Sequence, residues 1–177
     1  MRTNRLLLRI VPLLALALGG CRSGAVPSDA AGDVAADAPS VRMELGSGQL
    51  HWEDLPASAR VELIHGPQGG WHIFGRVRFD RLGPSVAVTF RVTPLAGGAP
   101  LNDPAERIRL AEGRGLVPVN GAWECSNALL VVLTALRDET AAAAVVGQRF
   151  RFETTVTSVE TGQSATTARE ITIVNDT

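Results

Sequence analysis

The stretch SVAVTFRV, residues 85–92, alternates large apolar side chains with small or polar ones. Successive side chains of an extended chain point to opposite faces, so this stretch would place all its large apolar groups on one side. That arrangement is typical of a β-strand that covers a core with one face and meets water with the other. The apolar set consists of Val86, Val88, Phe90 and Val92.

The same two-residue period recurs in residues 60–65, 71–79, 149–156 and 171–173. Within 71–79, one predicted face carries Trp71, Ile73, Val77 and Phe79, and the other carries His72, Arg76 and Arg78. Residues 128–136 are apolar almost throughout, which predicts a central strand buried on both faces. The repeated pattern indicates several antiparallel strands over one core.

Glycine and proline separate these runs at residues 66–70, 82–84, 96–100 and 160–163. Glycine adopts positive φ readily and proline presets φ at about −65°, so both favour chain reversal. We therefore expect a single all-β domain over residues 41–177, an antiparallel β-sandwich of about seven or eight strands.

One short helix is also expected, at residues 140–146, where four alanines follow a threonine. The hydroxyl of Thr140 is a suitable N-cap for such a helix, because it can accept a hydrogen bond from a free backbone N–H group of the first turn. A helix of this length would form part of a connection between strands.

The order of these runs resembles that of immunoglobulin-like domains. The hairpin at 149–174, with its turn at Thr161 and Gly162, is similar to the last two strands of such domains. The chain departs from the family in two respects. It has no tyrosine, and Cys125 is its single cysteine after residue 21, so it lacks both a tyrosine corner and an internal disulfide pair. The resemblance concerns the fold and implies no activity.

The residue composition excludes several functions. All 17 basic residues are arginines, so a Schiff-base lysine and a phosphate-loop lysine are absent, as is a tyrosine acid or base. Removal of the first 20 residues, which contain three arginines, leaves 14 basic and 18 acidic residues and a net charge of −4. Nucleic-acid binding needs concentrated positive charge, so it is not expected. The short motifs of serine hydrolases, zinc proteases and nucleotide-binding proteins are also absent.

Residues 1–20 have the parts of a signal peptide: three arginines, the apolar run 10–18, and small residues before Cys21. The apolar run is shorter than the roughly 20 residues of a membrane-spanning helix. Leu18-Gly19-Gly20-Cys21 resembles the lipobox of bacterial lipoproteins. The resemblance implies cleavage before Cys21 and attachment of lipid to its thiol. Two or more acyl chains would give stable membrane anchoring.

Residues 22–40 consist largely of Ala, Gly, Ser, Pro and Asp, a composition that buries little surface and predicts a flexible tether. Arg22 stands where the inner-membrane retention signal of lipoproteins has Asp. By that resemblance the lipidated chain is expected in the cell envelope, at the outer membrane, facing the periplasm or the cell surface.

The most distinctive segment is HGPQGGWH, residues 65–72, which resembles a segment found in lipoproteins of unassigned activity. Its candidate binding residues are His65, Gln68, Trp71 and His72. Three interpretations stay open. The segment could be a plain structural turn. It could be a surface for a protein or polysaccharide partner, because turns on a rigid scaffold often carry binding groups. It could also hold Cu(II) or Zn(II) through His65, His72 and His51, with Cys125 as a softer fourth ligand.

Cys125 admits three interpretations: a small buried apolar residue, one half of an intermolecular disulfide, or a nucleophile. No local motif places a base beside it. The sequence therefore favours a membrane-anchored lipoprotein with a non-catalytic binding or structural module and no cofactor. The alternative is a periplasmic copper- or zinc-binding lipoprotein.

Overall fold

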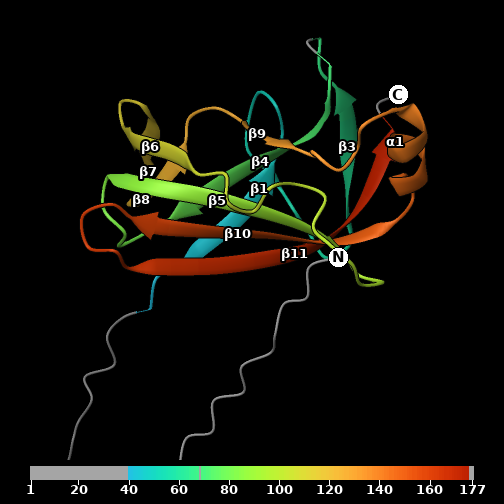
Figure 1. Cartoon of the computed structure of the whole chain (residues 1–177). Coiled ribbons are helices and arrows are strands. Elements are labelled where there is room, and N and C mark those ends of the chain that lie inside the picture. Colours follow the sequence, from blue (N-terminus) through green and yellow to red (C-terminus); the bar gives the residue numbers. More distant parts are fainter. Residues whose placement is uncertain (1–39, 68, 176–177) are drawn as a thin grey trace, which may run out of the picture. The chain divides into compact units, whose positions relative to one another are not determined.

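A computed structural model describes residues 40–67 and 69–175 of the chain (Figure 1). This part contains eleven strands and one short helix. The strands in order are β1 (Met43–Ser47), β2 (Glu53–Asp54), β3 (Ala59–His65), β4 (Trp71–Phe79), β5 (Ser85–Pro94), β6 (Ile108–Glu112), β7 (Gly115–Val119), β8 (Ala122–Cys125), β9 (Leu129–Val132), β10 (Arg149–Ser158) and β11 (Ser164–Asn175). Helix α1 (Glu139–Val145) lies between β9 and β10. No helix in this part has the length and apolar character needed to cross a membrane.

The prediction of a β-rich fold is confirmed, but the sheet is mixed. Strands β5, β10 and β11 form an antiparallel group in front of β1 and β4 (Figure 1). β11 then pairs with β3 in parallel, and β6 pairs with β7 in parallel. The expectation of a purely antiparallel sandwich of seven or eight strands is therefore wrong. Alternation reports which face a residue occupies and contains no information about the direction of the neighbouring strand.

Strand β4 changes neighbours at its midpoint. Its first half pairs with β3 and β9, and its second half pairs with β1 and β8. Gly75 lies at the change, and a Cβ atom there would stand 2.8 Å from the ring of Phe90 and 3.1 Å from that of Phe152. β4 therefore packs against β5 and β10 so closely that only glycine fits at this position.

The core follows the alternation seen in the sequence. The inward residues of β5 and β10 are buried, and the rings of Phe90 and Phe152 stack with centroids 5.6 Å apart. On β4, Ile73, Val77 and Phe79 are also buried, whereas Trp71 packs against the edge of the core. The predicted division of β4 into an apolar and a polar face is confirmed.

Two local predictions are wrong. Residues 128–136 do not form a central strand: β9 pairs only with β4 among the described strands, and Leu130 and Val132 are exposed. Helix α1 is capped by Asp138, whose Oδ1 accepts the Ala141 N–H at 2.8 Å, and Thr140 lies inside the first turn. The apolar run at 128–136 does not reveal which of its residues face the core, because it has no alternation. At α1, the carboxylate of Asp138, two residues before Thr140, is the N-cap.

Candidate functional site

Five outward side chains from the adjoining parts of β3, β4 and β9 form a continuous surface that we call the outer apolar face: Ile64, His72, Phe74, Leu130 and Val132. The strand registers place Phe74 beside Leu130, His72 beside Val132, and Ile64 beside His72. Leu130 and Val132 are 51% and 38% exposed, and the other three side chains are half-buried. The rings of His72 and Phe74 meet edge to face with centroids 5.4 Å apart. The surface is therefore largely apolar with a single imidazole near its middle.

The outer side of β4 is covered along its second half only. Arg76 lies under the segment after β1 and is 2% exposed. Its guanidinium donates to the carbonyls of Gly48 (2.9 Å), Gln49 (3.2 Å) and Cys125 (3.3 Å). The ring of Trp52 lies 4.3 Å from the guanidinium of Arg78. The chain around β2 therefore protects the second half of β4, and the outer apolar face begins where that cover ends.

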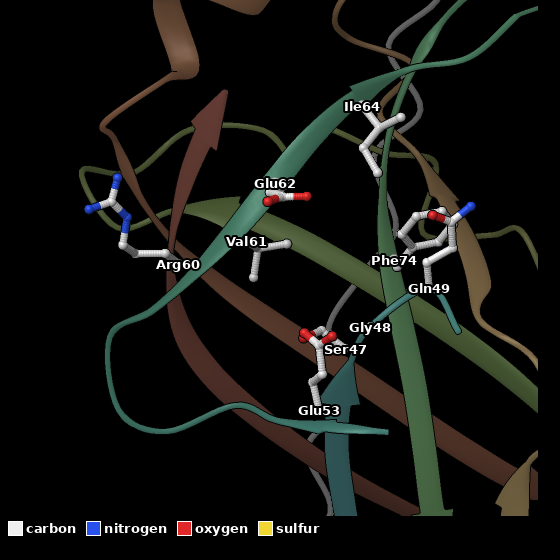
Figure 2. A pocket seen from close by; sticks show the side chains of 9 residues that line it. All are labelled: Ser47, Gly48, Gln49, Glu53, Arg60, Val61, Glu62, Ile64 and Phe74. Atoms are coloured by element: carbon white, nitrogen blue, oxygen red, sulfur yellow. The ribbon is translucent and has the colours of Figure 1, made fainter. Parts of the chain in front are cut away.

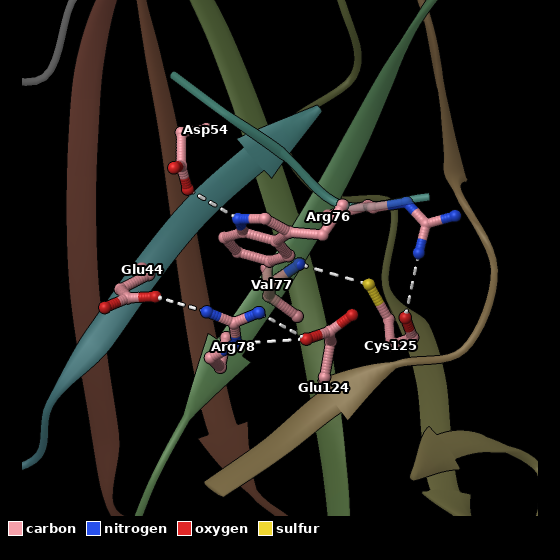
Figure 3. A network of polar contacts seen from close by, with 8 residues as sticks. Glu44, Asp54, Arg76, Val77, Arg78, Glu124 and Cys125 are labelled. Carbon is pink, nitrogen blue, oxygen red and sulfur yellow. Dashed lines mark hydrogen bonds and ion pairs between the residues drawn. The ribbon is translucent and has the colours of Figure 1, made fainter. Parts of the chain in front are cut away.

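Arg78 is held by acids as well as by the indole ring (Figure 3). It contacts Glu124 at 2.6 Å and Glu44 at 3.1 Å, and these bonds raise the pKa of the arginine. The indole N–H of Trp52 donates to Asp54 at 2.7 Å. These polar groups satisfy one another, which indicates that this network fixes the position of β2.

Cys125 belongs to the core. Its thiol is fully buried and accepts the backbone N–H of Val77 at 3.1 Å. Burial raises the pKa of the thiol, so it is protonated at neutral pH. It forms no disulfide within the part of the chain that the structure describes. The buried, unreactive interpretation is the one that this geometry supports.

A pocket of about 230 Å³ lies at one margin of the outer apolar face, and we call it the acidic pocket (Figure 2). Ile64 and Phe74 form its apolar wall and belong to the outer apolar face as well. The carboxylates of Glu53 and Glu62 lie toward the hollow, whereas the guanidinium of Arg60 extends away from it. The remaining lining residues are Ser47, Gly48, Gln49 and Val61.

The predicted histidine cluster is only partly assembled. His65 and Trp71 lie opposite each other on β3 and β4, with ring centroids 4.6 Å apart. His72 points to the other face of β4, into the outer apolar face. Burial, and next the nearby His65, lower the pKa of His72. His51 lies in the segment between β1 and β2, 3.6 Å from Glu53. Gln68 and Cys21 lie outside the described residues.

Within residues 40–67 and 69–175, no group of three or more His, Cys, Asp or Glu side chains is arranged to hold a metal ion. His65, His72 and His51 therefore do not form a shared three-ligand site in this fold. The sequence places all three near the first strands, but adjacent strand positions face opposite ways. His65 packs against Trp71 on one face, and His72 packs against Phe74 on the other.

A second groove, of about 440 Å³, lies over the outer side of β5, β10 and β11, under the loop that contains Pro104. Three of its four hydroxyl groups are already paired: Thr155 bonds to Thr166 and Thr157 to Ser164, each at 2.8 Å. Groups that satisfy one another offer little to a ligand, so this groove is the weaker candidate.

Sequence reasoning identified His72 but missed Phe74, Leu130, Val132 and the acidic pocket. The signal for Leu130 and Val132 is present in the sequence. They alternate with Leu129 and Val131 in a strand of four apolar residues, and such a strand on a surface exposes half of them. Their exposure becomes visible only when the fold places β9 at an edge.

The sequence matches no protein-family model and no curated protein. Among solved structures, the chain is similar to the CooA pilin subunit from enterotoxigenic Escherichia coli, with 14% identity and a TM-score of 0.38. The match covers 76% of this chain and 99% of the pilin chain. The likeness is a distant one between β-rich folds.

Proposed function

We propose that this chain is a lipid-anchored envelope protein whose folded part is a non-catalytic module that binds another envelope protein. The signal peptide, Cys21 and the tether supply the anchor. The outer membrane is the expected location, because Arg22 follows Cys21 where the inner-membrane retention signal of lipoproteins has Asp. The folded module supplies the contact surface.

The observation that carries this proposal is the uncovered outer apolar face. Exposed apolar patches on soluble domains commonly mark interaction sites, because leaving them in water is unfavourable. β9 is also a strand of uncharged residues that, among the strands described, pairs with β4 alone. Such edges are usually protected by charges or proline. Leu130 and Val132 lack both kinds of protection in their own strand.

The binding role can be tested in cells that produce the full chain. A photoreactive amino acid replaces Leu130, and in a matched control it replaces Val159, which is apolar, 53% exposed and lies in the turn between β10 and β11. We expect position 130 to give one discrete adduct, identified by mass spectrometry, that position 159 does not give. Absence of such an adduct at position 130 would remove the support for a binding module.

The anchor is tested separately. Mass spectrometry of the mature N-terminus is expected to find acylated Cys21, and Cys21→Ala is expected to release the chain from the membrane fraction. An unmodified N-terminus at another residue would contradict the lipoprotein assignment while leaving the binding module untouched.

Metal binding is the second candidate, and it rests on the three histidines that the sequence offers, His65, His72 and His51. Residues 22–177 can be titrated with Cu(II) and Zn(II), with His72→Ala as the control. We expect no tight stoichiometric binding, because His65 and His72 lie on opposite faces of the β3–β4 pair. Tight one-to-one binding that is lost in His72→Ala would favour the metal function instead.

A further inference from the structure

We propose that the acidic pocket accepts an arginine or lysine side chain of the partner protein, while apolar residues of the same partner cover the outer apolar face. This inference rests on the proposed function and specifies the chemistry of the partner. It concerns a site that the sequence did not indicate.

The pocket and the face form one continuous surface. Ile64 and Phe74 line the pocket and also belong to the face, and Phe74 lies beside Leu130 on β9. A partner that covers Leu130 and Phe74 therefore reaches the opening of the pocket. The apolar wall suits the methylene stem of a long basic side chain, which packs along apolar surface while its head contacts polar groups.

The accessible charge of the pocket is negative. The carboxylates of Glu53 and Glu62 lie toward the hollow (Figure 2). Two cations are close, but neither occupies it. Arg60 extends away, and buried Arg76 donates to the carbonyls of Gly48 and Gln49. Glu53 has one further neighbour, His51 at 3.6 Å. Opposite charge in this position attracts a basic group and repels an acidic one.

The same charge argues against a lipid surface as the occupant. Membranes with anionic lipids attract clusters of basic residues, whereas the pocket presents two carboxylates beside the apolar residues. A protein segment with a basic side chain among apolar ones complements both parts of this surface.

The probe for this inference is a random dodecapeptide library displayed on phage and selected on immobilised residues 22–177, which include the whole described fold. Peptides that also bind the Leu130→Asp variant are removed. The matched control is Val159→Asp, which carries the same substitution at another exposed apolar position and should still bind the retained peptides. The remaining peptides are then tested against the Glu53→Gln/Glu62→Gln variant, with Glu112→Gln, an exposed acid on β6, as its control. Urea denaturation of each variant verifies that it is folded.

We expect the retained peptides to share one Arg or Lys among apolar residues, and to bind the double glutamine variant at least tenfold more weakly than Glu112→Gln. Peptides that need Leu130 but show no basic preference would overturn this inference and leave the proposed function standing. A selection with no peptide that depends on Leu130 would overturn both. Binding to phosphatidylglycerol vesicles that Leu130→Asp abolishes would assign the face to lipid and also overturn the inference.

Discussion

Arg76 shows how one residue sets the limit of the candidate site. Its charge is buried, and its three described acceptors are backbone carbonyls. These bonds tie the segment after β1 and the end of β8 to the middle of β4. The outer apolar face lies directly beyond this point, so the position of Arg76 decides how much of β4 is covered.

Replacement of Arg76 by alanine is expected to lower the free energy of unfolding by about 3 kcal/mol, because buried carbonyls lose charge-assisted hydrogen bonds and a cavity remains. Arg76→Lys should recover only part of this loss, since an ammonium group cannot reproduce the planar fork of donors. Urea denaturation measures both. Arg91→Ala, at an exposed position on β5, is the control and should change stability by less than about 0.5 kcal/mol. A similarly small change in Arg76→Ala would contradict the anchoring role.

His72 gives a prediction for pH. Burial, and next His65, lower the pKa of His72 in the folded state. The unfolded chain, with an imidazole pKa of about 6.5, then binds a proton more readily than the folded chain. The contribution of His72 to the free energy of unfolding should therefore be fully present above about pH 6.5 and be lost as the pH falls below that value. Urea denaturation at pH 7.5 and at pH 5 gives the free energy of unfolding at each pH. The difference between the two values should be smaller for His72→Gln than for the wild type. The control Val159→Ala, at an exposed position without a titrating side chain, should keep the wild-type difference.

At the scale of elements, the connection before β10 depends on its helix cap. Asp138→Ala is expected to destabilise the domain by about 1 kcal/mol, because the Ala141 N–H loses its acceptor. Thr140→Ala should be close to neutral, since Thr140 lies within the first turn of α1. Thermal or urea denaturation of the two variants distinguishes the caps. A larger effect of Thr140→Ala would restore the interpretation drawn from the sequence alone.

Gly75 is the second test at this scale, because it sets how closely β4 approaches β5 and β10. Gly75→Ala should cost about 1–3 kcal/mol through overpacking against Phe90 and Phe152. Gly66→Ala is the control, since a Cβ atom there meets the ring of His72 at an ordinary 3.5 Å. Because the strain is local, Phe90→Leu in the Gly75→Ala background should cost less than Phe90→Leu alone. Strictly additive effects would show that the close approach does not limit the packing.

The sequence allowed us to predict which face of a strand is buried, but not which strands pair with one another. The alternation over residues 85–92 correctly placed Phe90 in the core, because the face of a strand follows from its own period. The exposure of Leu130 depends on β9 being an edge, which follows from the pairing of distant strands. The acidic pocket likewise combines β1, β2, β3 and β4, and no local pattern links Glu53 to Glu62 or Phe74.

At the scale of the whole folded part, the pairings connect distant stretches of the chain into one circuit. β3, near its start, pairs with β11, near its end, and the series through β10, β5, β6, β7 and β8 returns to β4. No strand of this circuit can be removed without unpairing two others. The folded part should therefore unfold as a unit.

This cooperativity leads to a prediction for equilibrium unfolding and a prediction for the rate of refolding. In residues 22–177, urea transitions followed by tryptophan fluorescence and by far-UV circular dichroism should coincide, and refolding should take milliseconds to seconds, because the pairings are non-local. A variant that keeps Trp52 and has Trp71→Phe and Trp123→Phe reports on the segment around β2, which the stack on Arg78 holds against β4. An earlier transition of Trp52 alone would show that this cover opens separately. The outer side of β4 would then be open along its whole length, with Arg76 and Arg78 exposed beside the outer apolar face.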